Sequence, residues 1–288
     1  MPIDTDVALS AAPTVRDASW TERDVILYHL GLGAGADSLD PAELRWVYEK
    51  DLRVLPTFAM VAGQGVSAGA VTPAGLSLRE STSTCAGSCT VASPSPCTPR
   101  SRSRFGDRLV SHLRCVGQGQ SRRDRARAVR SGRRRKPVVD QCDADLARGE
   151  GGFGGDAGPD VSNAVPERDA DKTLVSPTST QQALVYRLSA DMNPLHADPE
   201  FAKAAGFDRP ILHGLASYGV VCKAVVDGVL DGDPTRVRSF SVRFAGTLYP
   251  GETIETAVWR DGDTLTLLAT CPERDGQPVL THATMEIR

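Results

Sequence analysis

Side chains capable of acid–base chemistry lie close together in the second half of the sequence. Asp191, Asn193 and His196 fall within six residues, and Pro194 prevents a regular helix through them. We therefore expect this stretch to be a loop that leaves a strand. A carboxylate and an imidazole on one short loop can face a single pocket, where they can position a water, remove its proton and deliver another.

The same spacing also fits a structural role. Asp and Asn side chains often close turns by accepting hydrogen bonds from nearby backbone N–H groups. On this interpretation Asp191 and Asn193 are turn residues, and His196 lies at the surface. The spacing alone leaves both interpretations open.

A further candidate group is the backbone of Gly214, which follows the run PILH. We expect a long helix to start at this glycine, and the first N–H groups of a helix have no intrahelical acceptor. Gly214 can therefore present its N–H to an oxyanion that develops during a reaction. We expect the preceding His213 to be structural, through a polar contact at the start of the helix.

The sequence around these residues predicts a sheet wrapped around one helix. Residues 214–230 carry apolar side chains at helical spacing, and they are expected to share one face. Alternating or apolar runs bounded by turn residues predict strands in the flanking sequence. A short helix is expected at 199–205, and strands at 182–188, 237–248, 253–259, 264–270 and 279–287.

The N-terminal part of the chain has fewer clear elements. Residues 21–32 predict a helix that begins with a capping box of Thr21 and Asp24. A strand is expected to begin at 44–48, and the apolar run 55–63 is expected to be buried.

A change in composition divides the chain into domains. Residues 149–175 are rich in Gly, Asp and Pro, and they predict a linker between an N-terminal domain, 1–148, and a C-terminal domain, 176–288. The run GEGGFGG in this linker matches the dinucleotide-binding pattern G-x-G-x-x-G, which requires a helix directly after it. The DAGPD that follows is a poor helix start, so we interpret the glycines as a connector.

The overall composition sets aside several classes of protein. With 288 residues, of which 40% are hydrophobic, the chain is long enough for two domains with their own cores. No apolar run approaches the ~20 residues of a membrane helix, and the first residues lack the character of a secretory signal. A net charge of −3 does not indicate a nucleic-acid binder. We expect a cytoplasmic protein that binds neither membrane nor nucleic acid.

Residues 79–148 differ sharply from the rest of the chain. They hold 15 arginines and Lys136 against six acidic residues, and five of the seven cysteines, but no Ile, Trp, Tyr or Met. A segment so poor in large apolar side chains cannot offset its ordering entropy by burial. An arginine-rich nucleic-acid arm, a disordered linker and a cysteine metal site are three interpretations, and the cysteine spacing fits the metal site poorly.

A shifted reading frame is a fourth interpretation, and it fits this composition best. Arg, Ser, Cys, Pro and Gly together are typical of GC-rich coding DNA translated out of frame. A back-translation of 78–85 with one base restored gives LPGIDVDL, and the stretch from Cys115 gives VWDKGKAAVIVLE in a different frame. At least three single-base losses are then implied, near residue 78, between residues 95 and 112, and near residue 146. On this hypothesis 79–148 is disordered.

The runs YRLSADMNPLHADPEFA and FDRPILHGL resemble the MaoC-like, type 2 (R-specific) enoyl-CoA hydratases, whose signature reads Y-x-L-S-G-D-x-N-P-L-H-x-D-P. Residues 1–78 resemble the first half of the double-hot-dog members of this family. The resemblance implies an α+β double hot-dog fold, with an antiparallel sheet wrapped around a central helix. It also implies that the N-terminal hot-dog is disrupted at 79–148.

The resemblance further implies a reaction and roles for the candidate residues. Asp191 and His196 would be the catalytic acid–base pair, and Asn193 would help to hold the water or the pair. Gly214 would supply the N–H of an oxyanion hole. The implied reaction is hydration of trans-2-enoyl-CoA to (3R)-3-hydroxyacyl-CoA in fatty-acid or sterol side-chain metabolism. The acyl-CoA would be the binding partner of a homodimer that needs no metal or other cofactor.

One residue departs from the signature, because Ala190 stands where the family has glycine. If the backbone has a positive φ there, alanine costs about 1 kcal/mol or more. Such strain would misaim Asp191 and lower the rate.

Three other functions stay open. A dehydratase of fatty-acid synthesis performs the same chemistry in reverse, and the sequence does not set the direction. A hot-dog thioesterase is a second alternative, against which the complete D-x-N-P-L-H run argues. A non-enzymatic, arginine-rich nucleic-acid binder is the third.

Overall fold

The computed structural model describes most of the chain outside the interval 63–164. Backbone and side chains are described for 20–62, 165–189 and 191–288. Within these ranges, no helix is both long and apolar enough to cross a membrane. The backbone alone is described for the strands at 14–18, 88–92, 107–115, 121–126 and 140–146.

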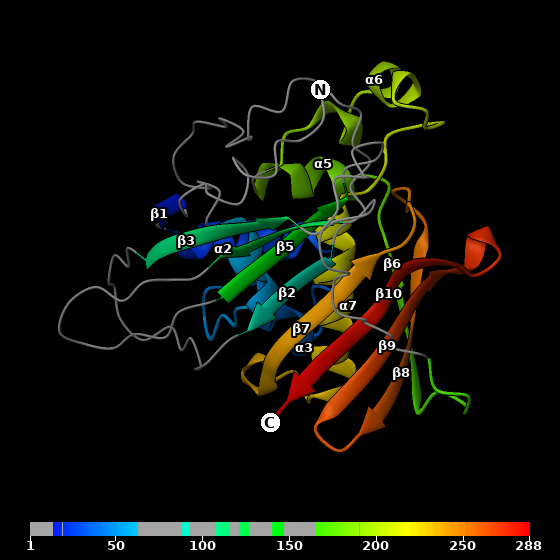
Figure 1. Ribbon diagram of the computed structural model, residues 1–288. Helices are drawn as coiled ribbons and strands as arrows, with labels where there is room; N and C mark the ends of the chain where they lie inside the picture. The colour runs from blue at the N-terminus through cyan, green and yellow to red at the C-terminus, as the bar shows by residue number, and fades with distance from the viewer. Residues whose placement is uncertain are drawn as a thin grey trace.

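The C-terminal half is a helix wrapped by an antiparallel sheet, as Figure 1 shows. Burial alternates along the strands, as expected when one face of a sheet packs on a helix and the other meets solvent. The helix and the four strands expected after it are confirmed. They are α7 (Gly214–Val229), β7 (Val237–Phe244), β8 (Thr253–Asp261), β9 (Thr264–Cys271) and β10 (Gln277–Ile287), with β6 (Lys172–Pro177) as the edge strand.

The sheet continues into the N-terminal half. Its order is β1-β3-β4-β5-β2-β7-β10-β9-β8-β6, and the two halves join where β2 pairs antiparallel with β7. Five strands from each half give the arrangement of a double hot-dog, so the expected α+β fold is confirmed. The N-terminal strands are β1 (Thr14–Ala18), β2 (Ser88–Ala92), β3 (Asp107–Cys115), β4 (Ser121–Ala126) and β5 (Asp140–Leu146).

Strands β2 to β5 lie inside 79–148, where the sequence predicts disorder. In the four described stretches the backbone is paired instead, with Ser88 opposite Arg243 at the join between the halves. Backbone pairing requires an extended chain and a neighbouring strand, and β7 offers that neighbour whatever side chains β2 carries. This pairing does not test whether the coding DNA is read in a shifted frame, so the shifted-frame hypothesis stays a prediction.

The first described helix, α2 (Glu22–Gly31), begins as expected. The Thr21 side chain and the Asp24 side chain form a capping box, with Thr21 N donating to Asp24 Oδ2 at 2.7 Å. The apolar run after it forms a 3-10 turn, η1 (Pro56–Phe58), and a short helix, α4 (Ala59–Ala62). Both are mostly buried, as the sequence predicts.

A helix, α3 (Pro41–Val47), stands where a strand was expected at 44–48, so that prediction is wrong. Asp40 accepts a hydrogen bond from Ala42 N at 2.7 Å, and a proline occupies the first helical position. These start signals outweigh the short apolar run. Trp46 on this helix is fully buried.

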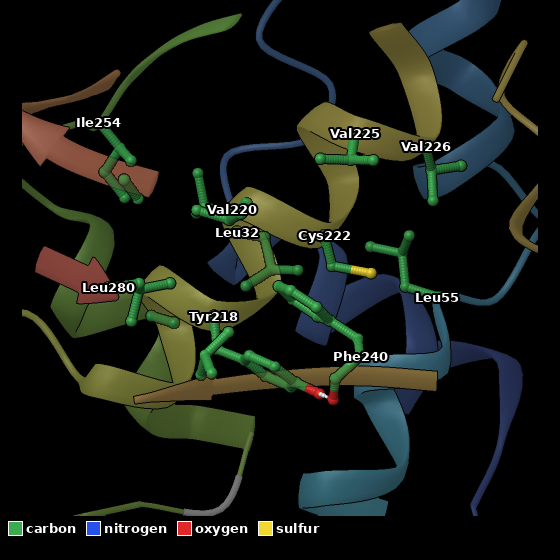
Figure 2. Close-up of a cluster of buried hydrophobic side chains, with 14 of the residues drawn as sticks. Leu32, Leu55, Tyr218, Val220, Cys222, Val225, Val226, Phe240, Ile254 and Leu280 are labelled. Carbon is green, nitrogen blue, oxygen red and sulfur yellow. Dashed lines mark hydrogen bonds between the residues drawn. The ribbon is translucent and has the colours of Figure 1, made fainter. Parts of the chain in front are cut away.

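One core spans both halves of the molecule, with α7 at its centre. Figure 2 shows Leu32 and Leu55 of the N-terminal half in a single cluster with side chains of α7 and of the strands that follow it. The Tyr218 ring stacks on Phe240 at 4.6 Å between centroids, and its hydroxyl donates to the Phe240 carbonyl at 2.9 Å. Gly219 allows a close approach from α2, because a Cβ there would lie 2.6 Å from Leu32. The N-terminal helices therefore complete the core around α7.

The prediction of a strand at 182–188 is wrong, because this stretch forms α5 (Gln182–Tyr186) and the 3-10 turn η2 (Arg187–Ser189). The Gln182 Oε1 atom accepts from Ser179 N at 3.0 Å at the start of the helix. So short an apolar run does not distinguish a helix from a strand. The strand that leads to the site is β6, whose first residues fall in the expected linker 149–175. The glycines of GEGGFGG lie outside the described residues.

Candidate active site

The loop between α5 and α7 carries the three predicted side chains. Asp191 Oδ1 accepts a hydrogen bond from Asn193 N at 3.1 Å, and Asn193 Oδ1 accepts one from Leu195 N at 3.0 Å. Asn193 thereby caps the 3-10 turn η3 (Pro194–His196). The turn hydrogen bonds of the structural interpretation are thus present, and they leave the second carboxylate oxygen of Asp191 available. Ala190 lies outside the described residues, so its predicted strain stays a prediction.

His196 is buried rather than at the surface. Its Nδ1 lies 2.8 Å from the carbonyl oxygen of Ile211. A carbonyl only accepts, so Nδ1 of the neutral ring carries the proton and Nε2 keeps a free lone pair. Burial lowers the pKa of His196, and this outweighs the opposing effects of the Ile211 hydrogen bond and the Asp191 charge. The ring is therefore held as a neutral base.

The two catalytic candidates face each other across a short gap. His196 Nε2 lies 3.8 Å from Asp191 Oδ2, too far for a direct hydrogen bond. The side chain of Asp191 is 43% exposed, so solvent reaches this gap. A single water can lie about 2.8 Å from each atom and donate to both. The pair can hold a nucleophilic water and accept its proton.

Gly214 is the first residue of α7, and it is exposed although most of the helix behind it is buried. Among the described residues, its N–H makes no hydrogen bond. The N–H groups and the dipole at the start of a 16-residue helix favour negative charge. A Cβ at this position would lie 3.2 Å from the Phe244 ring. The backbone there suits an oxyanion.

Sequence reasoning assigned no role in the chemistry to His213. This histidine does not cap α7 with its side chain. Its Nε2 lies 3.2 Å from the main-chain oxygen of Asp191, and its ring stacks on His196 with 3.6 Å between centroids. Tyr186 contacts the same ring at 4.8 Å. The only signal in the sequence is the position of His213 directly before Gly214.

The same cluster offers atoms that a metal could use. Asp191, His196 and His213 each present one ligand atom, and these atoms lie within 4.8 Å of one another. The ring planes of His196 and His213 are only 24° apart. The nitrogen lone pairs lie in these two nearly parallel planes, so they do not converge on one metal ion. A tetrahedral site needs converging ligands. The expectation that the site uses no metal or other cofactor stays a prediction.

Comparison with known proteins assigns the chain to a family. The MaoC-like domain matches residues 161–268, and the MFE-2 hydratase 2 N-terminal domain matches residues 19–78. Enoyl-CoA hydratase ChsH3 of Mycobacterium tuberculosis is 42% identical over 98% of each chain. The chain belongs to the MaoC-like, type 2 enoyl-CoA hydratase family. The resemblance read from the two sequence runs is therefore confirmed.

Two further relatives agree with this assignment. Peroxisomal enoyl-CoA hydratase 2 of Arabidopsis thaliana is 35% identical over 85% of this chain and 83% of its own. The crystal structure of a MaoC-like dehydratase from Phytophthora capsici superposes with a TM-score of 0.83 at 26% identity, covering 99% of this chain and 98% of that one. The two family matches leave 79–160 between them, and this interval includes the segment of unusual composition.

Proposed function

We propose that this protein is a hydro-lyase that adds water to trans-2-enoyl-CoA thioesters and forms (3R)-3-hydroxyacyl-CoA. The observation that carries the proposal is the pair formed by Asp191 Oδ2 and His196 Nε2, 3.8 Å apart, on the loop that leads to Gly214, an exposed residue at the first position of α7. Enoyl-CoA hydratases from two organisms, at 42% and 35% identity, support it.

In the proposed mechanism the thioester carbonyl accepts the N–H of Gly214. This hydrogen bond stabilises negative charge on the thioester oxygen, so C3 of the conjugated alkene becomes electrophilic. Water held between Asp191 and His196 attacks C3, and one of its protons passes to the pair as the C–O bond forms. The pair returns that proton to C2 on the same face of the substrate. The hydroxyl group of the water is then on C3 and its other proton is on C2, and both side chains regain their starting protonation states.

Hydration of crotonyl-CoA tests the proposal. Hydration removes the ultraviolet absorption of the conjugated enoyl thioester, whereas the absorption of the adenine and the unconjugated thioester remains. We therefore expect the absorbance to fall at a rate proportional to enzyme concentration. A thiol reagent in a parallel reaction separates this activity from thioester hydrolysis, which would release free CoA. Loss of absorbance without a free thiol supports the hydratase, and release of thiol would favour the thioesterase.

The direction of the reaction depends on the substrate supplied. A catalyst lowers the barrier in both directions, so the same site dehydrates (3R)-3-hydroxyacyl-CoA when that compound is in excess. A role in fatty-acid or sterol side-chain metabolism is part of the proposal, and rates on straight-chain and steroid enoyl-CoA substrates would distinguish the two.

The remaining expectations belong to the same proposal. We propose a cytoplasmic homodimer that needs no metal, other cofactor, membrane or nucleic acid. Size-exclusion chromatography and cell fractionation test the assembly and the location. Activity that survives dialysis against a chelator would support the absence of a metal, and activity lost on dialysis and restored by a divalent cation would contradict it.

A further inference from the structure

We propose that His213 is a positioning residue, whose Nε2–H holds the main-chain carbonyl of Asp191 and so keeps the Asp191 carboxylate directed at His196. The inference rests on the proposed hydratase function and adds a residue to that site.

The hydrogen bond defines the protonation of His213. Its Nε2 lies 3.2 Å from the Asp191 carbonyl oxygen, which can only accept, so Nε2 carries the proton. The side chain is 1% exposed, and Nδ1 is buried with no hydrogen-bond partner among the described residues. A second proton on Nδ1 would be buried without an acceptor, at a large free-energy cost. The ring is therefore neutral, with one tautomer.

Packing fixes the orientation of this ring. The His196 ring stacks on it at 3.6 Å, and the Tyr186 ring contacts it at 4.8 Å with an interplanar angle of 51°. A ring confined in this way cannot turn its Nε2–H away from Asp191 without displacing His196 or Tyr186. The donor is thus preorganised before any substrate binds.

The segment that carries His213 also holds His196. The Ile211 carbonyl accepts from His196 Nδ1 at 2.8 Å, and Ile211 N donates to the Leu195 carbonyl at 3.3 Å. Leu212 N donates to the Leu248 carbonyl at 2.8 Å, which ties the segment to the connection after β7. Residues 211–213 therefore bond to the backbone of one catalytic residue and to the side chain of the other.

The segment 211–213 therefore positions both members of the catalytic pair and the proposed oxyanion donor relative to one another. The next residue in the chain is Gly214, whose N–H is the proposed oxyanion donor. A change at His213 that removes the hydrogen bond frees the Asp191 carbonyl, while the oxyanion donor and His196 stay attached to the segment. The expected defect is a lower kcat with little change in KM, because a misplaced carboxylate weakens the chemical step more than substrate binding.

Three substitutions separate the donor from the packing. In His213→Gln the amide nitrogen reaches about as far as imidazole Nε2 and keeps a donor, but loses the ring. In His213→Phe the ring remains without a donor, and His213→Leu fills the space with neither. We expect His213→Gln to retain kcat within about threefold, and His213→Phe and His213→Leu to lose about 10- to 100-fold with KM unchanged.

Thermal unfolding and crotonyl-CoA kinetics are measured for all four proteins. A packing role predicts the reverse order, with the phenylalanine variant active and the glutamine variant impaired, and that result would overturn the proposal. If the phenylalanine and leucine variants do not fold, the glutamine variant decides: near-normal kcat supports the proposal, and unfolding or a tenfold loss overturns it. Wild-type protein without hydratase activity would refute the proposed function itself, whereas active wild type with equally active variants would refute only the role of His213.

Discussion

The imidazoles of His196 and His213 stack 3.6 Å apart, yet they carry their protons on opposite nitrogens. His196 donates from Nδ1 to Ile211, and His213 donates from Nε2 to Asp191. The first arrangement leaves Nε2 of His196 free as a base, and the second steadies the residue that faces it. Burial is the main cause of the lowered pKa of both rings, to about 4 for His213, so neither ring is charged near neutral pH.

Removing either member of the pair should abolish most of the activity. Asp191→Asn and His196→Ala are each expected to lower kcat by about 10²–10⁴-fold, the usual contribution of a general acid or base. Circular dichroism should show an intact fold. Asp208→Asn makes the same charge change at an exposed residue of the same connection and should behave as wild type. Full activity in either site variant would refute the assignment of the pair.

The oxyanion role of Gly214 can be tested through its N–H alone. Gly214→Pro removes the N–H at the first position of α7, where proline is well tolerated. The preceding backbone, with φ −60° and ψ 136° at His213, is also compatible with a following proline. We expect a fall in kcat of about 10²–10³-fold.

Gly214→Ala is the matched control for the added side chain. It keeps the N–H and places a Cβ 3.2 Å from the Phe244 ring, which must shift by a few tenths of an ångström. Only a modest loss is expected from this variant. Equal losses in the alanine and proline variants would show that contact with Phe244, rather than the missing donor, lowers the rate.

The pH dependence of kcat/KM should reflect the neutral state of His196. Burial lowers its pKa below the ordinary 6.5, so the base form persists as the pH falls past that value. We therefore expect a constant kcat/KM from pH 8 down to about 6.5 and a decline only at lower pH. An acid limb centred above 6.5 would mean that His196 is charged too easily to serve as this base.

The join between α7 and α2 should be sensitive to one methyl group. In Gly219→Ala the new Cβ would lie 2.6 Å from Leu32 and 2.7 Å from the Tyr28 hydroxyl, so we expect a loss of about 1–3 kcal/mol in the free energy of unfolding. In Gly228→Ala the closest atom is a terminal carbon of Leu174, which is not fully buried and can turn away. Urea unfolding should show a much smaller effect for Gly228→Ala.

The coding DNA across residues 75–150 tests the shifted-frame hypothesis. We expect missing bases near codon 78, between codons 95 and 112, and near codon 146. Resequencing that finds no missing base would show that the arginine-rich segment is native.

The sequence predicted the elements whose local signals were strong. The capping box at Thr21 and the helical spacing after Gly214 both identified helices correctly, and alternation identified the strands after α7. It failed at 182–188 and 44–48, where short apolar runs suit either structure and a cap or tertiary packing decides. The spacing of Asp191 and His196 left a catalytic pair and a turn both open, and the catalytic roles of these two residues stay a prediction.

The role of His213 could not be found from sequence. Its partner Asp191 is 22 residues away, and the neighbouring backbone at Leu212 is held by a hydrogen bond to Leu248, in a different part of the chain. The tautomers of the two stacked histidines are set by the main-chain carbonyl groups of Ile211 and Asp191. No sequence pattern shows which carbonyl groups a histidine will contact. Side-chain spacing carries no information on such main-chain acceptors.

The stereochemistry of crotonyl-CoA hydration tests the central claim most directly. The product is offered in separate coupled reactions to dehydrogenases specific for (3R)- and (3S)-3-hydroxyacyl-CoA, and NADH formation is followed. The account predicts NADH only with the (3R)-specific enzyme, at a rate that Asp191→Asn lowers by about 10²-fold or more. Product used by the (3S)-specific enzyme, or no hydration by the wild-type protein, would contradict it.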